Sequence, residues 1–181
     1  RQIVIAPDSF KGTMEASQVC QIIQGSARQY FPDAAVRCIP MADGGEGMVD
    51  AYLKLLGGRK VLLSVQGLQG RPVACYYGIL PDGTAVMEMA ACAGPPLLDG
   101  ALDPMHTTTY GVGEMLLHAE HNGVRRVLLG IGGSATVDCG LGMAAALGYR
   151  FLNKDGAAVE AVTCHMAEIS AIVPPARKPA L

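Results

Sequence analysis

The sequence predicts an α/β protein built from Rossmann-like parallel βα units and a second α/β domain that contains an antiparallel meander. Short strand-like runs at 3–6, 35–39 and 127–129, the first and last of them continuously apolar, each lead into a glycine-rich polar loop and then into a helical pattern. This order is typical of strands that are buried on both faces of a parallel sheet. Residues 60–91 differ, because three strand-like runs follow one another with only turns between them, which indicates an antiparallel sheet.

Composition excludes several classes of protein. Hydrophobic residues make up 50% of the 181 residues, charged residues only 17%, and 23 residues are glycine. A disordered or coiled-coil chain is therefore excluded, and a buried sheet with glycine-rich ligand loops is favoured. The net charge of −2 gives no reason to expect nucleic acid or an anionic membrane as a partner. No apolar run approaches the about 20 residues of a membrane-spanning helix.

The six cysteines show neither a C-x-x-C pair nor zinc-type spacing with the four histidines. We expect them to be small buried apolar residues in a reducing compartment. Only two residues precede the first predicted strand, so no signal peptide is expected and the predicted location is cytoplasmic.

We assign residues 1–58 to the N-terminal part of a Rossmann-like domain. Its predicted elements are the two strands at 3–6 and 35–39, a helix from Thr13 to Tyr30, and a helix at 48–56. Thr13 is expected to cap the first helix. The apolar positions of that helix recur with helical spacing and comprise Val19, Ile22, Ile23, Ala27 and Tyr30.

Each of these strands ends in a polar loop, where open α/β sheets bind their ligands. The first loop reads Pro7-Asp8-Ser9-Phe10-Lys11-Gly12 and supplies a carboxylate, a hydroxyl and an ammonium group. The second reads Asp43-Gly44-Gly45-Glu46-Gly47. Three glycines around two carboxylates favour a pocket for a cation or a polyol over a purely structural turn.

Residues 59–158 form the predicted second domain. Its meander at 60–91 has strands at 60–66, 72–79 and 84–91, and the middle strand alternates with period two, so one of its faces is expected to be buried. Glu88 is a carboxylate inside the apolar third strand, either on a solvated face or deliberately placed.

A βα unit at 107–156 follows, with helices at 112–122 and 140–147. Thr107, Thr108 and Thr109 either cap the first of these helices or bind a ligand. His118 and His121 lack a third metal ligand nearby and are expected to be solvated. Residues 159–181 are predicted to be an irregular tail, because three prolines occur near the end.

The loop at 130–138, between a strand and a helix, predicts a phosphate site. Its glycines let backbone amides approach an anion, and the helix start adds positive potential. Ser134, Thr136 and Asp138 supply two hydroxyls and a carboxylate, a set that can hold phosphate oxygens and a magnesium ion.

Two nucleotide-binding classes can be compared with this loop. The sequence has no G-x-x-x-x-G-K-[ST], which excludes a P-loop enzyme. A G-x-G-x-x-A pattern at Gly130, Gly132 and Ala135, with Asp155 about 20 positions on, leaves a nicotinamide-dependent oxidoreductase as a rival. Lys11 and the scattered carboxylates favour phosphoryl transfer, in which catalysis is mostly positioning and charge neutralisation.

Five stretches resemble the bacterial glycerate kinase family. They occur in order over residues 3–156 and read IVIAPDSFKGTMEA, PMADGGEGMVDAY, TAVMEMAACAG, DPMHTTTYGVGE and GIGGSATVDCGLGMAAALG. The resemblance implies an ATP- and magnesium-dependent kinase of D-glycerate that favours the 2-position, with one α/β domain inserted into another. Family members are considerably longer, so this chain is expected to be an N-terminal portion. Where the family usually has N-D-G-G-A-G, this chain has V-D-C-G-L-G, with Val137 and Cys139 as the departures.

The resemblance implies a role for each site residue. Asp8 is expected to orient or deprotonate the glycerate hydroxyl, and Lys11 to neutralise the phosphoryl group or the substrate carboxylate. Magnesium is assigned to Asp138, with Asp43 as the alternative. The full assignment is catalytic Asp8, Lys11 and Asp43; substrate-binding Ser9, Gly44, Gly45, Glu46 and Thr108; nucleotide-binding Gly132, Gly133, Ser134 and Thr136; and metal-binding Asp138.

The expected partners are therefore ATP, magnesium and D-glycerate, with neither nucleic acid nor membrane. Two further expectations concern the chain as it stands. It is either an active kinase portion or a non-catalytic module that binds nucleotide or substrate. Apolar parallel strands without neighbours recruit other chains, so the strands at 3–6 and 35–39 predict self-association.

Overall fold

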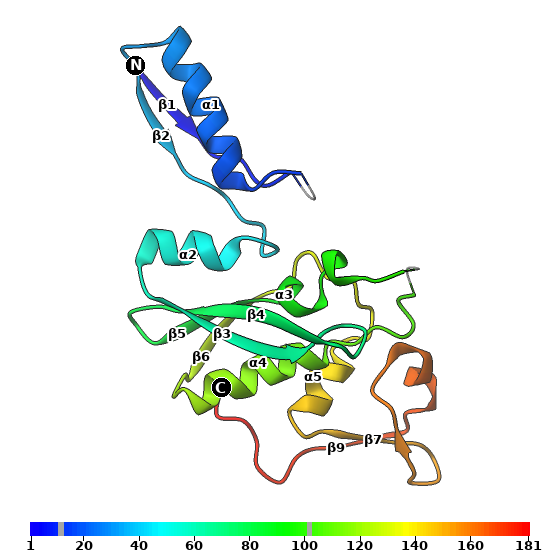
Figure 1. Ribbon diagram of the computed structural model, residues 1–181. Coiled ribbons are helices and arrows are strands. Elements are labelled where there is room, and N and C mark those ends of the chain that lie inside the picture. Colours follow the sequence, from blue (N-terminus) through cyan, green and yellow to red (C-terminus); the bar gives the residue numbers. More distant parts are fainter. Residues whose placement is uncertain (11–12, 101–102) are drawn as a thin grey trace.

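A computed structural model describes residues 1–10, 13–100 and 103–181, and Figure 1 shows the arrangement. Within this part of the chain there are three sheets. The first pairs β1 with β2, the second has the order β3-β4-β5-β6, and the third has the order β8-β7-β9. Helices pack on parallel and antiparallel strands, which confirms the predicted α/β class.

The N-terminal unit is a parallel βαβ motif. β1 (Gln2–Ile5) pairs with β2 (Ala35–Cys38), and α1 (Ala16–Tyr30) connects them. The helix begins three residues later than the sequence predicts. Glu15, not Thr13, is its cap, because the side chains of Glu15 and Gln18 form a reciprocal capping box with each other's backbone amides.

The apolar face of α1 is only partly covered. Val19 and Cys20 are buried against the strands, whereas Ile22 is 58% exposed and Tyr30 is 74% exposed. Figure 1 shows β1, α1 and β2 apart from the larger sheet, with α2 between them. This unit therefore presents apolar side chains to solvent, although the spacing predicts that all of them belong to a buried face.

The second sheet forms the main core. β3 (Arg59–Gln66) and β4 (Pro72–Ile79) are antiparallel, as are β4 and β5 (Thr84–Glu88), whereas β5 and β6 (Arg126–Gly130) are parallel. Every residue of β5 is buried.

Helices cover both faces of this sheet. On one face, α4 (Tyr110–His121) packs with Val112 and Met115 against Tyr77 and Met87. On the other, α2 (Met48–Leu56) packs against Val86 and Leu80. Successive strand residues point to opposite faces, so Val86 and Met87 serve the two cores. The sequence analysis assigns α2 to the first domain, with a boundary near residue 58, and that boundary stays a prediction. The packing of α2 on the second sheet instead favours a boundary before this helix.

Two predicted elements differ in the structure. The third strand of the meander ends at Glu88, because α3 (Ala90–Ala93) and the 3-10 helix η1 (Pro95–Leu97) follow it. The tail predicted to be irregular contains a 3-10 helix, η2 (Thr163–Glu168), and β9 (Ala171–Val173).

β9 pairs with β7 (Arg150–Leu152), which also pairs with β8 (Ala158–Val159). Prolines lack the N–H that a ladder needs, so Pro174 and Pro175 limit the length of β9 without excluding the strand. The helix predicted at 140–147 is α5 (Leu141–Ala146).

Within the described residues, no helix has the length and apolar character needed to cross a membrane. All six cysteines are free thiols; Cys20, Cys75 and Cys92 are buried as predicted, whereas Cys38 and Cys164 are only half-buried. Cys139 is instead exposed and adopts φ +50°, a left-handed conformation that suits glycine better. His118 is not a purely solvated residue, because its Nδ1 lies 3.1 Å from the hydroxyl of Tyr77.

Candidate functional site

The polar loops that follow β1, β2 and β6 lie side by side. The amide of Met41 donates to the carbonyl of Pro7 over 2.9 Å, which joins the first two loops. The amide of Gly132 donates to the carbonyl of Gly44 over 3.0 Å, which joins the second loop to the third. Backbone hydrogen bonds therefore connect three stretches that are far apart in the sequence, although β1 and β2 belong to a different sheet from β6.

Glycine is required where the second and third loops touch. A Cβ atom on Gly130 would lie 2.2 Å from the carbonyl oxygen of Gly44, and one on Gly132 would lie 2.8 Å from the nitrogen of Gly45. Neither approach is possible for a residue with a side chain unless the backbone moves. The glycines at these two positions thus allow two loops to pack, in addition to any role in approaching a ligand.

In the loop at 132–136, some hydrogen-bond donors have an acceptor within the described residues and others have none. The hydroxyls of Ser134 and Thr136 lie 2.7 Å apart, and the amide of Thr136 donates to Ser134 Oγ. The amide of Ala135 donates to the carbonyl of Ala93. The amides of Gly133 and Ser134 have no hydrogen-bond acceptor in the part of the chain that the structure describes. Two amides and two hydroxyls suit a phosphate group.

Asp138, the predicted magnesium ligand, is 1% exposed and accepts four hydrogen bonds. Its donors are the amide and hydroxyl of Thr109, at 2.9 and 2.8 Å, and the amides of Gly140 and Gly142, each at 3.0 Å. The carboxylate therefore occupies the start of α5, where the sequence predicts that the helix end faces a phosphate. The magnesium role of Asp138 stays a prediction, and this geometry favours a structural role.

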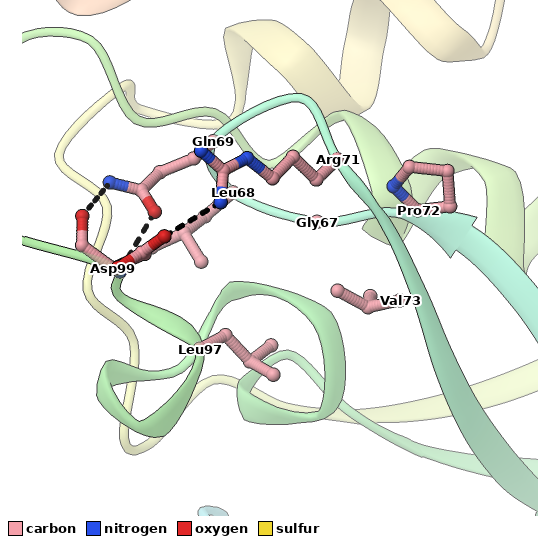
Figure 2. Close-up of a pocket in the computed structure, with 8 residues that line it drawn as sticks. All are labelled: Gly67, Leu68, Gln69, Arg71, Pro72, Val73, Leu97 and Asp99. Atoms are coloured by element: carbon pink, nitrogen blue, oxygen red, sulfur yellow. Dashed lines mark hydrogen bonds and ion pairs between the residues drawn. The ribbon is translucent and has the colours of Figure 1, made fainter.

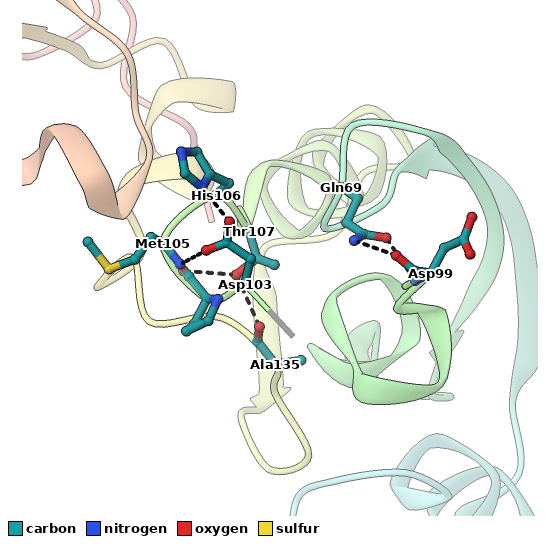
Figure 3. A network of polar contacts seen from close by, with 8 residues as sticks. Gln69, Asp99, Asp103, Met105, His106, Thr107 and Ala135 are labelled. Carbon is teal, nitrogen blue, oxygen red and sulfur yellow. Dashed lines mark hydrogen bonds and ion pairs between the residues drawn. The ribbon is translucent and has the colours of Figure 1, made fainter. Parts of the chain in front are cut away.

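Thr107, Thr108 and Thr109 are all buried, and each has partners within the chain. Figure 3 shows Thr107, whose hydroxyl lies 3.1 Å from the carbonyl oxygen of Ala135. The hydroxyl of Thr108 accepts from the amide of Tyr110 at 3.2 Å. Thr107 therefore supports the loop at 132–136 through its bond to Ala135. The predicted contact of Thr108 with substrate has no direct support.

The carboxylates of the first two loops are accessible. Asp8 accepts a hydrogen bond from the Ser9 amide over 2.7 Å, Asp43 accepts one from the Gly45 amide over 2.9 Å, and Glu46 is exposed. Lys11 lies outside the described residues. No group of three potential metal ligands occurs within the described ranges. Asp43 and Glu46 supply two carboxylates on one loop, and Mg²⁺ in proteins usually takes one or two carboxylates together with phosphates and waters.

Glu88 is the site-adjacent residue whose position the sequence left open. It is 6% exposed, so it does not lie on a solvated face. Its Oε1 accepts a hydrogen bond from the amide of Val49 over 2.6 Å, at the start of α2. A charged residue inside an apolar strand was the only signal in the sequence, and its partner is 39 positions away in the chain.

A separate cavity of about 170 Å³ contains none of the predicted site residues (Figure 2). It lies at the β3–β4 turn, where Arg71 and Asp99 form an ion pair of 2.7 Å at its rim. Both side chains are largely exposed, so this pair is screened by solvent and contributes little to stability.

Comparison with known proteins finds relatives among the glycerate kinases. A glycerate kinase from Halalkalibacterium halodurans is 46% identical over 156 residues, which cover 85% of this chain and 41% of that protein. The glycerate 2-kinase of Escherichia coli K12 is 44% identical over 157 residues, covering 86% and 41% respectively. The chain thus spans less than half the length of these relatives.

The crystal structure of a candidate glycerate kinase 2 from Salmonella typhimurium LT2 superimposes with a TM-score of 0.75 at 39% identity, covering 94% of this chain and 46% of that one. The sequence profile described as the Glycerate kinase family matches residues 3–181. This chain belongs to the glycerate kinase family.

Proposed function

We propose that this chain supplies the nucleotide and substrate loops of a kinase that transfers the γ-phosphoryl group of ATP to D-glycerate. The observation that carries the proposal is the hydrogen-bonded continuity of the loops after β1, β2 and β6. This continuity supports a site in which phosphate donors and carboxylates act together, as phosphoryl transfer requires. The 2-hydroxyl is the proposed acceptor, supported by the name of the Escherichia coli relative, glycerate 2-kinase.

Each loop has its own part in this proposal. The amides of Gly133 and Ser134, with the hydroxyls of Ser134 and Thr136, bind phosphate oxygens. Asp43 and Glu46 would hold Mg²⁺, which when bound neutralises phosphate charge. Gly44 and Gly45 shape this loop and leave room for the substrate beside it.

The first loop serves the acceptor. Asp8 orients the glycerate hydroxyl and takes its proton late, since the transition state is loose and needs little early proton removal. Ser9 binds the substrate beside Asp8, and Lys11 neutralises the transferred group. A cytoplasmic location belongs to the same proposal and is supported by the six free thiols.

The rival oxidoreductase has less support from the geometry. A dinucleotide fold places pyrophosphate at the start of the helix that follows the glycine-rich turn. Here Asp138 already fills the start of α5 with its carboxylate. A second negative group at that position would be repelled, so NAD is expected to bind poorly.

Isothermal titration of the 181-residue chain separates the candidate functions. We expect Mg·ATP and D-glycerate to bind, and Ser134→Ala to weaken Mg·ATP binding about tenfold, since a hydrogen bond to a charged group contributes about 1.5 kcal/mol or more. The matched control is Ser170→Ala, at an exposed serine in the tail. A coupled assay of ADP release then distinguishes turnover from binding alone. Preference for NAD would support the oxidoreductase, and no binding would contradict the proposal.

We also propose that the chain self-associates through its N-terminal unit. β1 and β2 have no other strand partner in the described residues, and Val4 and Ile39 are exposed, as are Ile22 and Ile23 of α1. Unpaired strand edges and apolar side chains together favour association with another copy.

Light scattering coupled to gel filtration, over a hundredfold range of concentration, tests self-association. We expect a mass above that of one chain which falls on dilution, and Ile22→Glu is expected to shift the chain to the monomer. The matched control is Leu62→Glu, because Leu62 is 78% exposed on β3, outside this unit. A monomer at every concentration would contradict this proposal.

A further inference from the structure

Glu88 is a buried carboxylate at the point where the second and third loops meet. It is the last residue of β5, and its register partner in β6 is Gly130, the first glycine of the phosphate loop. The amide of Met89 donates to the carbonyl of Gly130 over 2.8 Å. Glu88 is therefore fixed by backbone pairing to the strand that carries the loop at 130–136.

The side chain of Glu88 contacts the start of α2, which follows the loop at 43–47. Its Oε1 accepts from the amide of Val49 over 2.6 Å, and the neighbouring amide of Gly47 also favours the charged form, since it lowers the pKa of this carboxyl. These amides belong to the first turn of α2, where a negative charge is favourable. Since Gly47 ends the loop at 43–47, the carboxylate holds that loop against the strand that ends at Gly130.

We propose that Glu88 is a positioning residue that sets the place of Asp43 and Glu46 relative to the loop at 130–136. This inference rests on the proposed function, since those two carboxylates matter there as ligands near phosphate. Glu88 is itself buried and touches neither reacting group. It acts through the start of α2, and the contact between Gly44 and Gly132 carries its effect to the phosphate loop.

Burial and the backbone amides act on the pKa of Glu88 in opposite directions. Burial raises the pKa of its carboxyl above the ordinary glutamate value, the amides of Val49 and Gly47 lower it, and the charges of Asp50 and Glu46 raise it. The phenol of Tyr76 also faces it from β4. The net pKa is raised, so the stability that Glu88 contributes is greatest below the ordinary glutamate pKa and falls as pH rises through the folded-state pKa.

The test compares Glu88→Gln with Glu114→Gln. Glu114 is a matched control, because its Oε2 also accepts from a backbone amide, that of Gln66, over 2.6 Å, but away from the loops. A glutamine at 88 keeps an oxygen that can accept from the Val49 amide, but it loses the negative charge that strengthens this bond. We expect hydrogen exchange at the Gly132 amide in the nucleotide-free chain to quicken about tenfold in Glu88→Gln beyond any change in Glu114→Gln.

Two further measurements separate positioning from general loss of stability. The amide shift of Val49 should titrate with pH in the unsubstituted chain and in Glu114→Gln, but not in Glu88→Gln. Mg·ATP binding should weaken about tenfold in Glu88→Gln alone, because small displacements of binding groups are costly. If the unsubstituted chain fails to bind Mg·ATP, the proposed function fails while the exchange at Gly132 still decides this inference. Equal exchange at Gly132 in both variants would overturn it.

Discussion

Replacing Asp138 by alanine is expected to lower the free energy of unfolding by about 3–5 kcal/mol, because several hydrogen bonds to one buried charge are lost together. The carboxylate is 1% exposed and binds Thr109, Gly140 and Gly142. Without it, three amides are left without that acceptor. Urea denaturation of both chains in the absence of Mg²⁺ measures this difference.

The matched control is Asp155→Ala, at an exposed aspartate in the turn after β7, for which a change within about 0.5 kcal/mol is expected. Asp138→Asn should lie between wild type and alanine, because an amide nitrogen cannot accept. If Asp138 binds magnesium instead, the alanine variant will be as stable as wild type in the absence of Mg²⁺ and will lose only the stabilisation that Mg²⁺ adds. That result would restore the role predicted from the sequence.

Asp138 also shows why part of the site could not be predicted. A carboxylate in a glycine-rich loop reads the same whether it binds a metal or caps a helix. The difference lies in Thr109, which is 29 positions away and reaches Asp138 only through the packing of α4 on α5. The fold class was easier, because the period-two alternation of β4 marks its buried face, whereas the continuous apolar run at 3–6 overstates burial, since Val4 is 61% exposed.

α1 gives the opposite lesson. Its apolar spacing correctly predicts a helix, but a pattern of this kind says which face is apolar and not what covers it. Ile22 and Ile23 are exposed, since nothing in the described chain packs on them. Likewise, β9 pairs with β7 although two prolines follow at once, because three residues suffice for a short antiparallel ladder. The local sequence pattern thus predicts the type of each element, but not the residues elsewhere in the chain that pack on it.

Replacing Gly130 by alanine is expected to lower the free energy of unfolding by about 3 kcal/mol, because overpacking a rigid contact forces the backbone to move. The added Cβ would lie 2.2 Å from the carbonyl oxygen of Gly44 and 2.7 Å from the sulfur of Met48. The loop at 43–47 cannot yield easily, since Gly44 also accepts from Gly132. The substitution should therefore separate the two loops as well as destabilise the chain.

The control is Gly25→Ala, in the middle of α1, where nothing lies within 4 Å of an added Cβ. That change should raise stability by about 0.5–1 kcal/mol, because alanine loses less backbone entropy than glycine on forming a helix. Urea denaturation gives both changes in the free energy of unfolding. Titration with Mg·ATP, without denaturant and at a temperature where each variant is folded, gives the affinity. We expect Gly130→Ala to bind at least about tenfold more weakly and Gly25→Ala to bind as wild type does. Wild-type affinity in a folded Gly130→Ala chain would show that the contact between the loops at 43–47 and 130–136 serves stability alone, and that nucleotide binding does not depend on it.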